Sequence, residues 1–187
     1  RKIEPMESFS TNFNHCPQDK QLDPDQTCFY CTAKTSRLNV IWNNDQNPKL
    51  ENFPMLLDEN TKTMLTDPLW VKALSFYLNK ISRARFFRFF VAGEIPNKQA
   101  LNKIYQIAKN CPSCEIWTPT TKHDLIFSMC ESQRKRNPKN YLEKYGHPKN
   151  LKINLSWTYI FQDIPEKLKR QARKYDLKIA TATPEEN

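Results

Sequence analysis

The sequence predicts an α/β protein, either a partial (β/α) barrel or an open parallel sheet, with about five β/α units. Short segments with alternating or continuous apolar residues are separated by segments whose apolar residues recur at helical spacing. This alternation repeats along the chain, which favours parallel strands joined by right-handed crossovers. The chain has 187 residues, whereas a closed eight-unit barrel usually needs about 250. A doubly wound sheet is the remaining alternative.

Length and composition predict one β/α domain over residues 1–187. Hydrophobic residues make up 39% of the chain, which is enough for a full core. No run approaches the roughly 18 apolar residues of a membrane span, and the N-terminus lacks the apolar core of a signal peptide. We therefore expect a soluble, intracellular protein with no membrane partner.

The first part of the chain predicts one strand and two helices. Phe9, Thr11 and Phe13 alternate within a strand from Glu7 to Phe13, and a polar cysteine loop follows at residues 14–32. Thr32 to Trp42 has helical spacing. A second helix is expected to begin at Asp67-Pro68, a cap residue followed by proline. Its apolar stripe, predicted to be core, comprises Leu69, Trp70, Ala73, Leu74, Tyr77 and Leu78.

The later part of the chain repeats the strand–helix unit. Phe86 to Ala92 is apolar except for Arg88, as expected for a strand covered on both faces. Gly93-Glu94-Ile95-Pro96 ends that strand. The further predicted elements are a helix at Asn97–Asn110, a strand at Glu115–Thr118, a helix at Lys122–Gln133, a strand at Leu151–Thr158, a helix at Pro165–Tyr175 and a strand at Leu177–Thr181.

The net charge of +9 favours anionic partners, including nucleic acid. Part of this charge lies in a basic insertion at residues 131–150, where Arg134, Lys135 and Arg136 are the nucleic-acid candidates. A solvated loop is the alternative. Arginines interleaved with phenylalanines at residues 83–90 could also contact nucleic acid, although core packing of those phenylalanines is favoured.

Candidate ligands follow the predicted strands where they end. Functional groups of parallel β/α folds gather at the carboxyl ends of the strands. In chain order these ends are followed by Cys16, Cys28 and Cys31, then by Gly93 and Glu94, then by Thr118 and Lys122, and then by Ser156. The alternative roles are helix capping for Glu94 and a plain surface position for Lys122.

The chain has six cysteines, which in an intracellular protein favour metal or redox chemistry over disulfides. Three thiolates from one loop suit an iron–sulfur cluster with one iron left open. Cys111 and Cys114 form a second pair, which could complete a four-cysteine zinc site with Cys28 and Cys31. That pair could also be a redox dithiol or plain structural cysteines at a helix end.

Cys28-Phe29-Tyr30-Cys31 resembles the second half of the radical S-adenosylmethionine signature. In that superfamily, three cysteines after the first strand of a partial β/α barrel hold a [4Fe–4S] cluster. The end of the strand at Gly93-Glu94 is similar to the superfamily's Gly-Gly-Glu-Pro motif, with Ala92 in place of the first glycine. The resemblance implies that Gly93 and Glu94 bind the methionine end and that Ser156 meets the ribose. The usual spacing would place the first cysteine at Pro24, so Cys16 replaces it from farther away.

Roughly residues 14 to 160 also resemble the phage and plasmid gene-product-eighty-eight family. This resemblance is carried by Cys16-Pro17, Cys31-Thr32-Ala33, Arg88 followed by Val91-Ala92-Gly93-Glu94, Ile116-Trp117-Thr118 leading to Thr121-Lys122, and Asn154-Leu155-Ser156. It implies a mobile-element protein in the cytoplasm of a bacterial or archaeal host. It supports the architecture and the cysteine site more than any reaction.

Two functions therefore remain open. One is a radical-S-adenosylmethionine-like enzyme with a [4Fe–4S] cluster and an unknown substrate. The other is a non-enzymatic protein in which zinc or a cluster holds the cysteine loop in place. Its basic surface would bind nucleic acid or a protein assembly.

Overall fold

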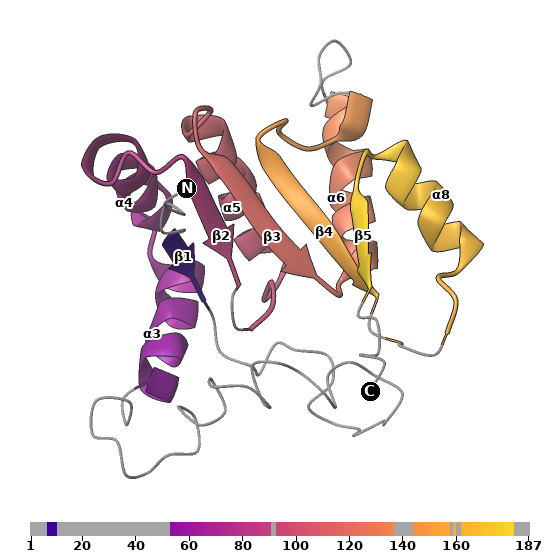
Figure 1. The fold of residues 1–187 in the computed structure, drawn as a ribbon. Coiled ribbons are helices and arrows are strands. Elements are labelled where there is room, and N and C mark those ends of the chain that lie inside the picture. The colour runs from indigo at the N-terminus through magenta and orange to yellow at the C-terminus, as the bar shows by residue number, and fades with distance from the viewer. Residues whose placement is uncertain are drawn as a thin grey trace, which may run out of the picture.

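The computed structural model of the protein describes residues 7–10, 53–90, 93–136, 144–157, 159 and 162–181. Their strands form one sheet in the order β1-β2-β3-β4-β5, and every neighbouring pair is parallel (Figure 1). The strands are β1 (Glu7–Phe9), β2 (Phe86–Phe89), β3 (Glu115–Thr120), β4 (Leu151–Trp157) and β5 (Lys178–Thr181). The predicted α/β class with an open parallel sheet is confirmed.

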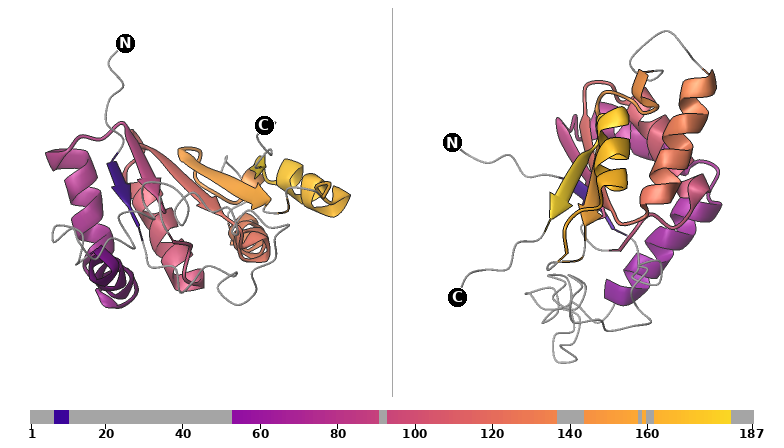
Figure 2. Two further views of the ribbon diagram at one scale, coloured as in Figure 1. Left: turned by 60° about the horizontal axis from the view of Figure 1, so that its bottom comes forward. Right: turned by 90° about the vertical axis from the view of Figure 1, so that its right-hand side faces the viewer.

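The described helices lie to one side of this sheet, as the right-hand view of Figure 2 shows. They are α3 (Phe53–Thr66), α4 (Trp70–Phe76), the π-helical turn η2 (Tyr77–Ile81), α5 (Lys98–Asn110), α6 (His123–Arg136) and α8 (Glu166–Lys174). The strand order rises steadily, so successive right-handed crossovers place their helices on the same face. A doubly wound sheet reverses its direction partway, and the described strands do not.

The two faces of the sheet carry different residues. The helix-covered face is buried in its centre, at Phe87, Phe89, Ile116, Thr118, Thr120, Leu151, Ile153 and Leu155, and half-buried at Phe9, Trp157 and Ile179. The alternating positions form what we call the open face, on which no side chain is buried. These positions are Ser8, Phe86, Arg88, Glu115, Trp117, Pro119, Lys152, Asn154, Ser156, Lys178 and Ala180.

The open face corrects one prediction. The run Phe86 to Ala92 was expected to be a strand covered on both faces. Within β2, however, Phe86 is 41% exposed and Arg88 is half-buried. The described helices cover one face only, and the strand ends at Phe89. Phe87 and Phe89 are core residues, as predicted for most of these phenylalanines.

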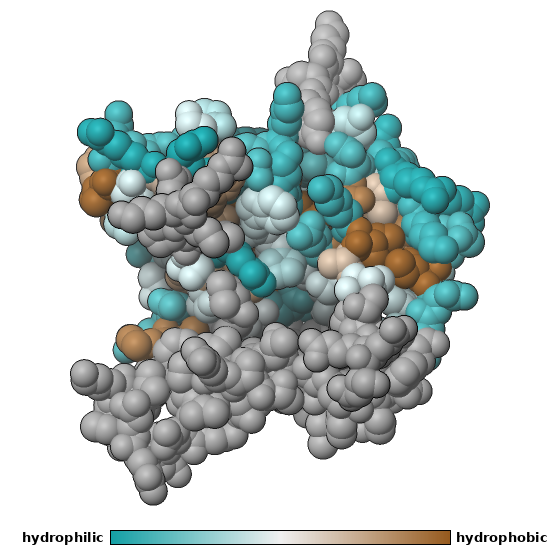
Figure 3. Space-filling view, viewed as in Figure 1, coloured by the Kyte–Doolittle hydropathy of each residue, from teal (hydrophilic) through white to brown (hydrophobic). Residues whose placement is uncertain are grey.

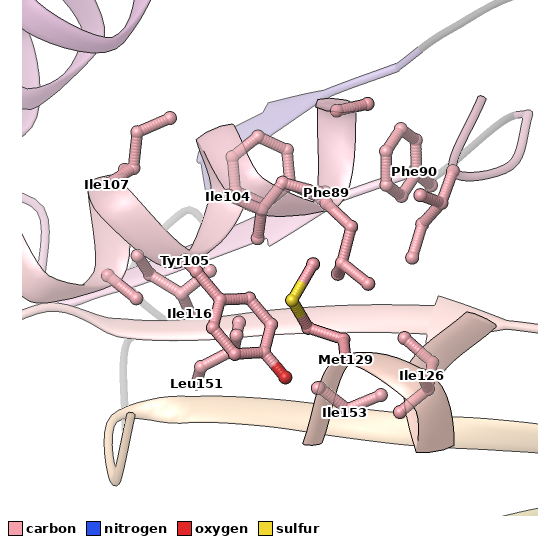
Figure 4. Packing of buried hydrophobic residues seen from close by; sticks show 14 of the residues in the cluster. Phe89, Phe90, Ile104, Tyr105, Ile107, Ile116, Ile126, Met129, Leu151 and Ile153 are labelled. Carbon is pink, nitrogen blue, oxygen red and sulfur yellow. The ribbon is translucent and has the colours of Figure 1, made fainter. Parts of the chain in front are cut away.

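The core lies between the sheet and helices α5 and α6. Figure 4 shows Phe89, Ile116 and Ile153 of the sheet meeting Ile104, Tyr105 and Met129 of the two helices. The helical stripes predicted for these segments are buried, including Leu101, Ile104, Tyr105 and Ala108 of α5 and Ile126, Met129 and Cys130 of α6. Aromatic rings extend the core to β1, where the Phe9 and Trp70 ring centroids are 5.3 Å apart.

Gly146 is required for the close approach of its loop to α6. Its φ is +79°, and a Cβ built there would overlap the carbonyl oxygen of Cys130. No other residue fits without a shift of the backbone, and the left-handed conformation also favours glycine.

The helical segment between residues 53 and 81 differs from the prediction. Helix α3 was not predicted, and α4 begins at Trp70 rather than at Asp67-Pro68. The Asp67 carboxylate instead accepts a 2.7 Å hydrogen bond from the Leu69 amide in the turn before α4. Trp70 and Leu78 are buried as predicted, whereas Leu69, Ala73 and Tyr77 are exposed.

No described helix is both long enough and apolar enough to span a membrane.

Candidate functional site

The strands of the sheet all end at its lower edge in Figure 1, which we call the carboxyl edge. Gly93 and Glu94 follow β2 at this edge, Thr121 and Lys122 follow β3, and Ser156 lies next to the last residue of β4. The parallel arrangement thus brings together residues that are far apart in the sequence, as predicted.

The Glu94 carboxylate joins the loop after β2 to the loop after β3. The side chain is 4% exposed. Its Oε1 accepts a 2.7 Å hydrogen bond from the Ile95 amide. Its Oε2 accepts two more, from the Thr121 amide at 2.7 Å and from the Thr121 hydroxyl at 2.9 Å. A buried carboxylate is stable when N–H and O–H donors surround it.

Glu94 does not cap the following helix, which was its alternative role. Helix α5 is capped by Asn97, whose side-chain oxygen accepts a 2.9 Å hydrogen bond from the Ala100 amide. Glu94 therefore holds the loop after β2 against the loop after β3 at the carboxyl edge.

Lys122 and His123 add two further connections at this edge. The Lys122 ammonium donates to the Pro96 carbonyl at 3.0 Å, so it links the same two loops as Glu94. The His123 Nε2 atom lies 2.9 Å from the Ser156 carbonyl, which ties the start of α6 to the end of β4. The ends of β2, β3 and β4 are consequently held together by side chains.

Backbone strain marks the end of β2. Phe90 is buried and has a φ of +58°, a left-handed conformation that is rare for a bulky residue and costs about 1 to 2 kcal/mol. Its amide donates a 2.6 Å hydrogen bond to the Phe9 carbonyl at the end of β1. Gly93 has a φ of +83°, a left-handed conformation that favours glycine. Such strain concentrates at functional sites.

Thr118 and Ser156 lie on opposite faces of the sheet. Thr118 is fully buried on the helix-covered face, where its hydroxyl has no hydrogen-bond partner among the described residues. Ser156 is half-buried on the open face, beside Ala180 of β5. Of these two predicted ligands, only Ser156 lies on the open face.

The predicted cluster ligands Cys16, Cys28 and Cys31 lie outside the described residues, as does the predicted helix from Thr32 to Trp42. Their segment connects the end of β1 to the start of α3, so it leaves the sheet at the carboxyl edge. Within the described ranges, no three His, Cys, Asp or Glu side chains are grouped so that they could hold a metal ion.

Cys111 and Cys114 lie at the opposite, amino edge of the sheet, between α5 and β3. Both side chains are buried, and the Cys111 thiol donates to the Ser75 carbonyl at 3.8 Å. Burial raises the pKa of Cys111, which favours the protonated thiol. The Asn150 amide donates to the carbonyls of Cys111 and Cys114, each at 2.9 Å. In this conformation the pair contributes packing to the amino edge.

Cys130 is a core residue. Its sulfur lies 3.6 Å from the Tyr105 hydroxyl, and burial raises its pKa to about 11.

Arg134, the described part of the basic candidate, has partners within the protein. Its guanidinium lies 3.9 Å from Glu131 and above the Tyr175 ring at 5.7 Å. Glu131 also accepts a 2.6 Å hydrogen bond from the Tyr175 hydroxyl, which with Lys174 lowers the pKa of that carboxyl. The side chains of Lys135 and Arg136 and residues 137–143 lie outside the described part of the chain.

Sequence reasoning missed the polar row on the open face. Arg88 of β2, Trp117 of β3 and Lys152 of β4 are direct neighbours in the sheet register. The available signal was the alternation of polar and apolar residues along β4, from Leu151 to Ser156, which predicts one covered face and one open face.

In a comparison with protein families, residues 3–187 match a family described as Gene product 88. This match confirms the resemblance to that family. No curated protein and no solved structure matches the chain.

Proposed function

The chain belongs to the Gene product 88 family, and we propose that it is a radical-S-adenosylmethionine-like iron–sulfur protein of a mobile element. In this proposal Cys16, Cys28 and Cys31 hold a [4Fe–4S] cluster, and S-adenosylmethionine binds beside it at the carboxyl edge. When bound, these groups would supply radical chemistry that removes a hydrogen atom from a substrate.

The observation that carries the proposal is the position of the cysteine segment in the sheet order. All described strands are parallel and follow one another in sequence, with helices on one face. The segment with the three cysteines leaves the end of β1, next to the end of β2, where the Phe9 carbonyl accepts from the Phe90 amide. The segment that contains the cysteines therefore begins at the edge that carries Gly93, Glu94 and Ser156.

The described residues fit the S-adenosylmethionine part of the proposal at three positions. Gly93 has the left-handed backbone that lets a ligand approach the main chain closely. Ser156 presents its side chain on the open face, where it can donate to a ribose hydroxyl. Glu94 is a positioning residue, because its carboxylate fixes the Gly93 loop against Thr121.

Thr118 and Lys122 were also expected to contact this cofactor. In the described conformation the Thr118 hydroxyl faces the helix-covered side and the Lys122 ammonium binds the Pro96 carbonyl. We therefore assign the cofactor contacts to Gly93 and Ser156, and leave Lys122 with Glu94 as a support of the loops.

Anaerobic reconstitution of the full chain with iron and sulfide tests the proposal. We expect iron and sulfide to be retained, S-adenosylmethionine to bind, and reductant to release 5′-deoxyadenosine. Cys16→Ala, Cys28→Ala and Cys31→Ala should each lose the iron, whereas the matched double variant Cys111→Ala/Cys114→Ala should keep it. A colourless protein after reconstitution would contradict the proposal.

The same experiment examines the non-enzymatic alternative, in which zinc or a cluster staples a basic binding protein. Zinc in the purified protein, lost from the Cys28→Ala and Cys111→Ala variants alike, would favour a four-cysteine zinc site. Arg134 gives that alternative little support, since its charge is already paired with Glu131.

A further inference from the structure

The open face carries three cations and one acid among its described residues. Arg88, Lys152 and Lys178 supply the positive charge and Glu115 the negative charge. In Figure 3, which is seen from this side, hydrophilic and neutral colours predominate over β3 and β4. A parallel sheet normally buries both faces under apolar contacts. A polar, positively charged face is therefore suited to a polar, anionic ligand.

The sheet register places an aromatic ring between two of these cations. Arg88 pairs with Trp117, and Trp117 pairs with Lys152. Neighbouring strands are about 4.8 Å apart, so these three side chains form a continuous row across β2, β3 and β4. Lys178 adds a third cation on β5. In the sheet register it lies opposite Asn154, two residues beyond Lys152 on β4.

The side chains of the row retain binding capacity. Within the described residues, neither Arg88 nor Lys178 has an ion pair, and Lys152 donates only to the neighbouring Lys149 carbonyl at 3.0 Å. Trp117 is half-buried, and its indole N–H donates a 2.8 Å hydrogen bond to Glu115. That bond fixes the edge of the indole and leaves its ring system as an apolar surface.

We propose that the open face binds single-stranded nucleic acid, with a base stacked on Trp117 and the phosphates on Arg88, Lys152 and Lys178. A sheet that presents aromatic rings flanked by cations is a general way to bind single strands, because every base has a stackable face and every linkage a phosphate. A duplex keeps its bases stacked on one another and offers none to Trp117.

The row of Arg88, Trp117 and Lys152 crosses the β-strands and lies on the amino side of Ser156. Ser156 lies four residues beyond Lys152 on β4, which corresponds to about 13 Å along the strand. The nucleic-acid site and the cofactor site proposed above are thus adjacent on one face but carried by different residues. The binding proposal rests on Arg88, Trp117, Lys152 and Lys178, and it does not depend on the cluster.

Fluorescence anisotropy with a labelled oligothymidine of about 12 nucleotides tests the proposal on the full chain, before and after reconstitution with iron. We expect binding that weakens with salt and exceeds binding to a duplex of the same length. Trp117→Ala should weaken binding by about 5- to 150-fold, whereas Trp117→Phe should retain most of it. Each of Arg88→Gln, Lys152→Gln and Lys178→Gln should reduce the salt slope by about 0.7.

A matched control removes the same charge from another surface. Lys167, Arg170 and Arg173 are exposed on α8, so their triple glutamine variant loses three charges outside the open face. Its affinity should remain several-fold higher than that of the open-face triple variant. Equal losses in the two triple variants, equal binding of single strand and duplex, or no binding by the wild type would each overturn the proposal. A protein that holds no iron can still pass this test, so the two proposals fail separately.

Discussion

The two faces of the sheet are built from the same strands but under different constraints. On the helix-covered face, eight side chains of β2, β3 and β4 are buried, and only Trp157 at the end of β4 is half-buried. On the open face the same strands present Arg88, Trp117, Lys152 and Asn154, and none of these is buried. One face therefore supplies the core of the fold, and the other presents side chains that the described helices do not cover.

The comparison separates the roles of residues that look alike in the sequence. Phe86 and Phe89 belong to one aromatic run, yet the first is 41% exposed and the second is fully buried. Glu94 and Glu115 are both acids beside β-strands, but Glu94 is buried with three donors and Glu115 is half-buried with one. These pairs offer matched experiments.

The largest expected effect is on the free energy of unfolding of the Phe89→Ala variant. Phe89 packs against Phe87 at 4.9 Å between ring centroids and against Phe9 at 6.1 Å, so its removal leaves a cavity in the core. Loss of a buried phenylalanine costs about 3 to 5 kcal/mol. Phe86→Ala on the open face should cost less than about 1 kcal/mol. Urea denaturation of both variants measures the difference, and equal losses would show that both faces are part of the core.

The next effect concerns the Glu94→Gln variant. An amide nitrogen in place of either carboxylate oxygen would face an N–H donor, because Ile95 and Thr121 both donate through their backbones. Hydrogen bonds to a charged group contribute about 1.5 to 3 kcal/mol, and we expect a loss of that size. Glu115→Gln is the control, since its amide oxygen can still accept from Trp117. A stability of Glu94→Gln equal to that of the control would refute the bridging role.

The strand and helix pattern could be predicted because local spacing determines it. The strands near Glu115 and Leu151 and the helix from Asn97 to Asn110 agree with the structure, since their apolar residues repeat at the period of the element. Helix α3 was missed because a threonine occupies its buried stripe. The Thr61 hydroxyl donates to the Leu57 carbonyl within the helix at 2.7 Å, so this polar residue is buried without an unsatisfied group.

The stripe after Trp70 could be predicted only in part, for a different reason. The chain changes from α-helix to π-helix at Tyr77, and the wider turn shifts the side chains that follow. Leu78 stays buried while Tyr77 is 41% exposed. A pattern based on 3.6 residues per turn places both in the core.

The residues of the candidate site could be predicted individually, but their contacts could not. Strand ends identified Gly93, Glu94, Lys122 and Ser156, because parallel strands end at one edge. The contact of Glu94 with Thr121 joins two loops 27 residues apart, and no local pattern encodes it. The three loop cysteines remain a prediction, because they lie outside the described residues.

A smaller effect is expected from pH at the amino edge. His147 is 2% exposed, and its Nε2 lies 2.8 Å from the Tyr175 carbonyl. Burial lowers the pKa of His147 below its usual value of about 6.5, so the unfolded chain binds the proton more readily. The associated stability is complete above that value and is lost as the pH falls toward the lower pKa of the folded state. Urea midpoints between about pH 7.5 and 5.5 should fall more steeply for the wild type than for His147→Gln. Parallel curves would contradict this assignment.

The smallest effect tests the Thr118 hydroxyl, which is unpaired among the described residues of the helix-covered face. Thr118 is fully buried, and no described group bonds its Oγ1 atom. An unpaired buried hydroxyl opposes folding, so Thr118→Val, which keeps the branched shape, should be neutral or stabilise the protein by up to about 1 kcal/mol. Thr120→Val is the control, because the Thr120 hydroxyl accepts a 3.0 Å hydrogen bond from the Lys122 amide and should be costly to remove. Thermal unfolding of the two variants with and without S-adenosylmethionine gives the comparison. If Thr118→Val is destabilised as much as Thr120→Val without S-adenosylmethionine, the Thr118 hydroxyl has a partner within the folded protein or its bound water, and its assignment as unpaired is wrong.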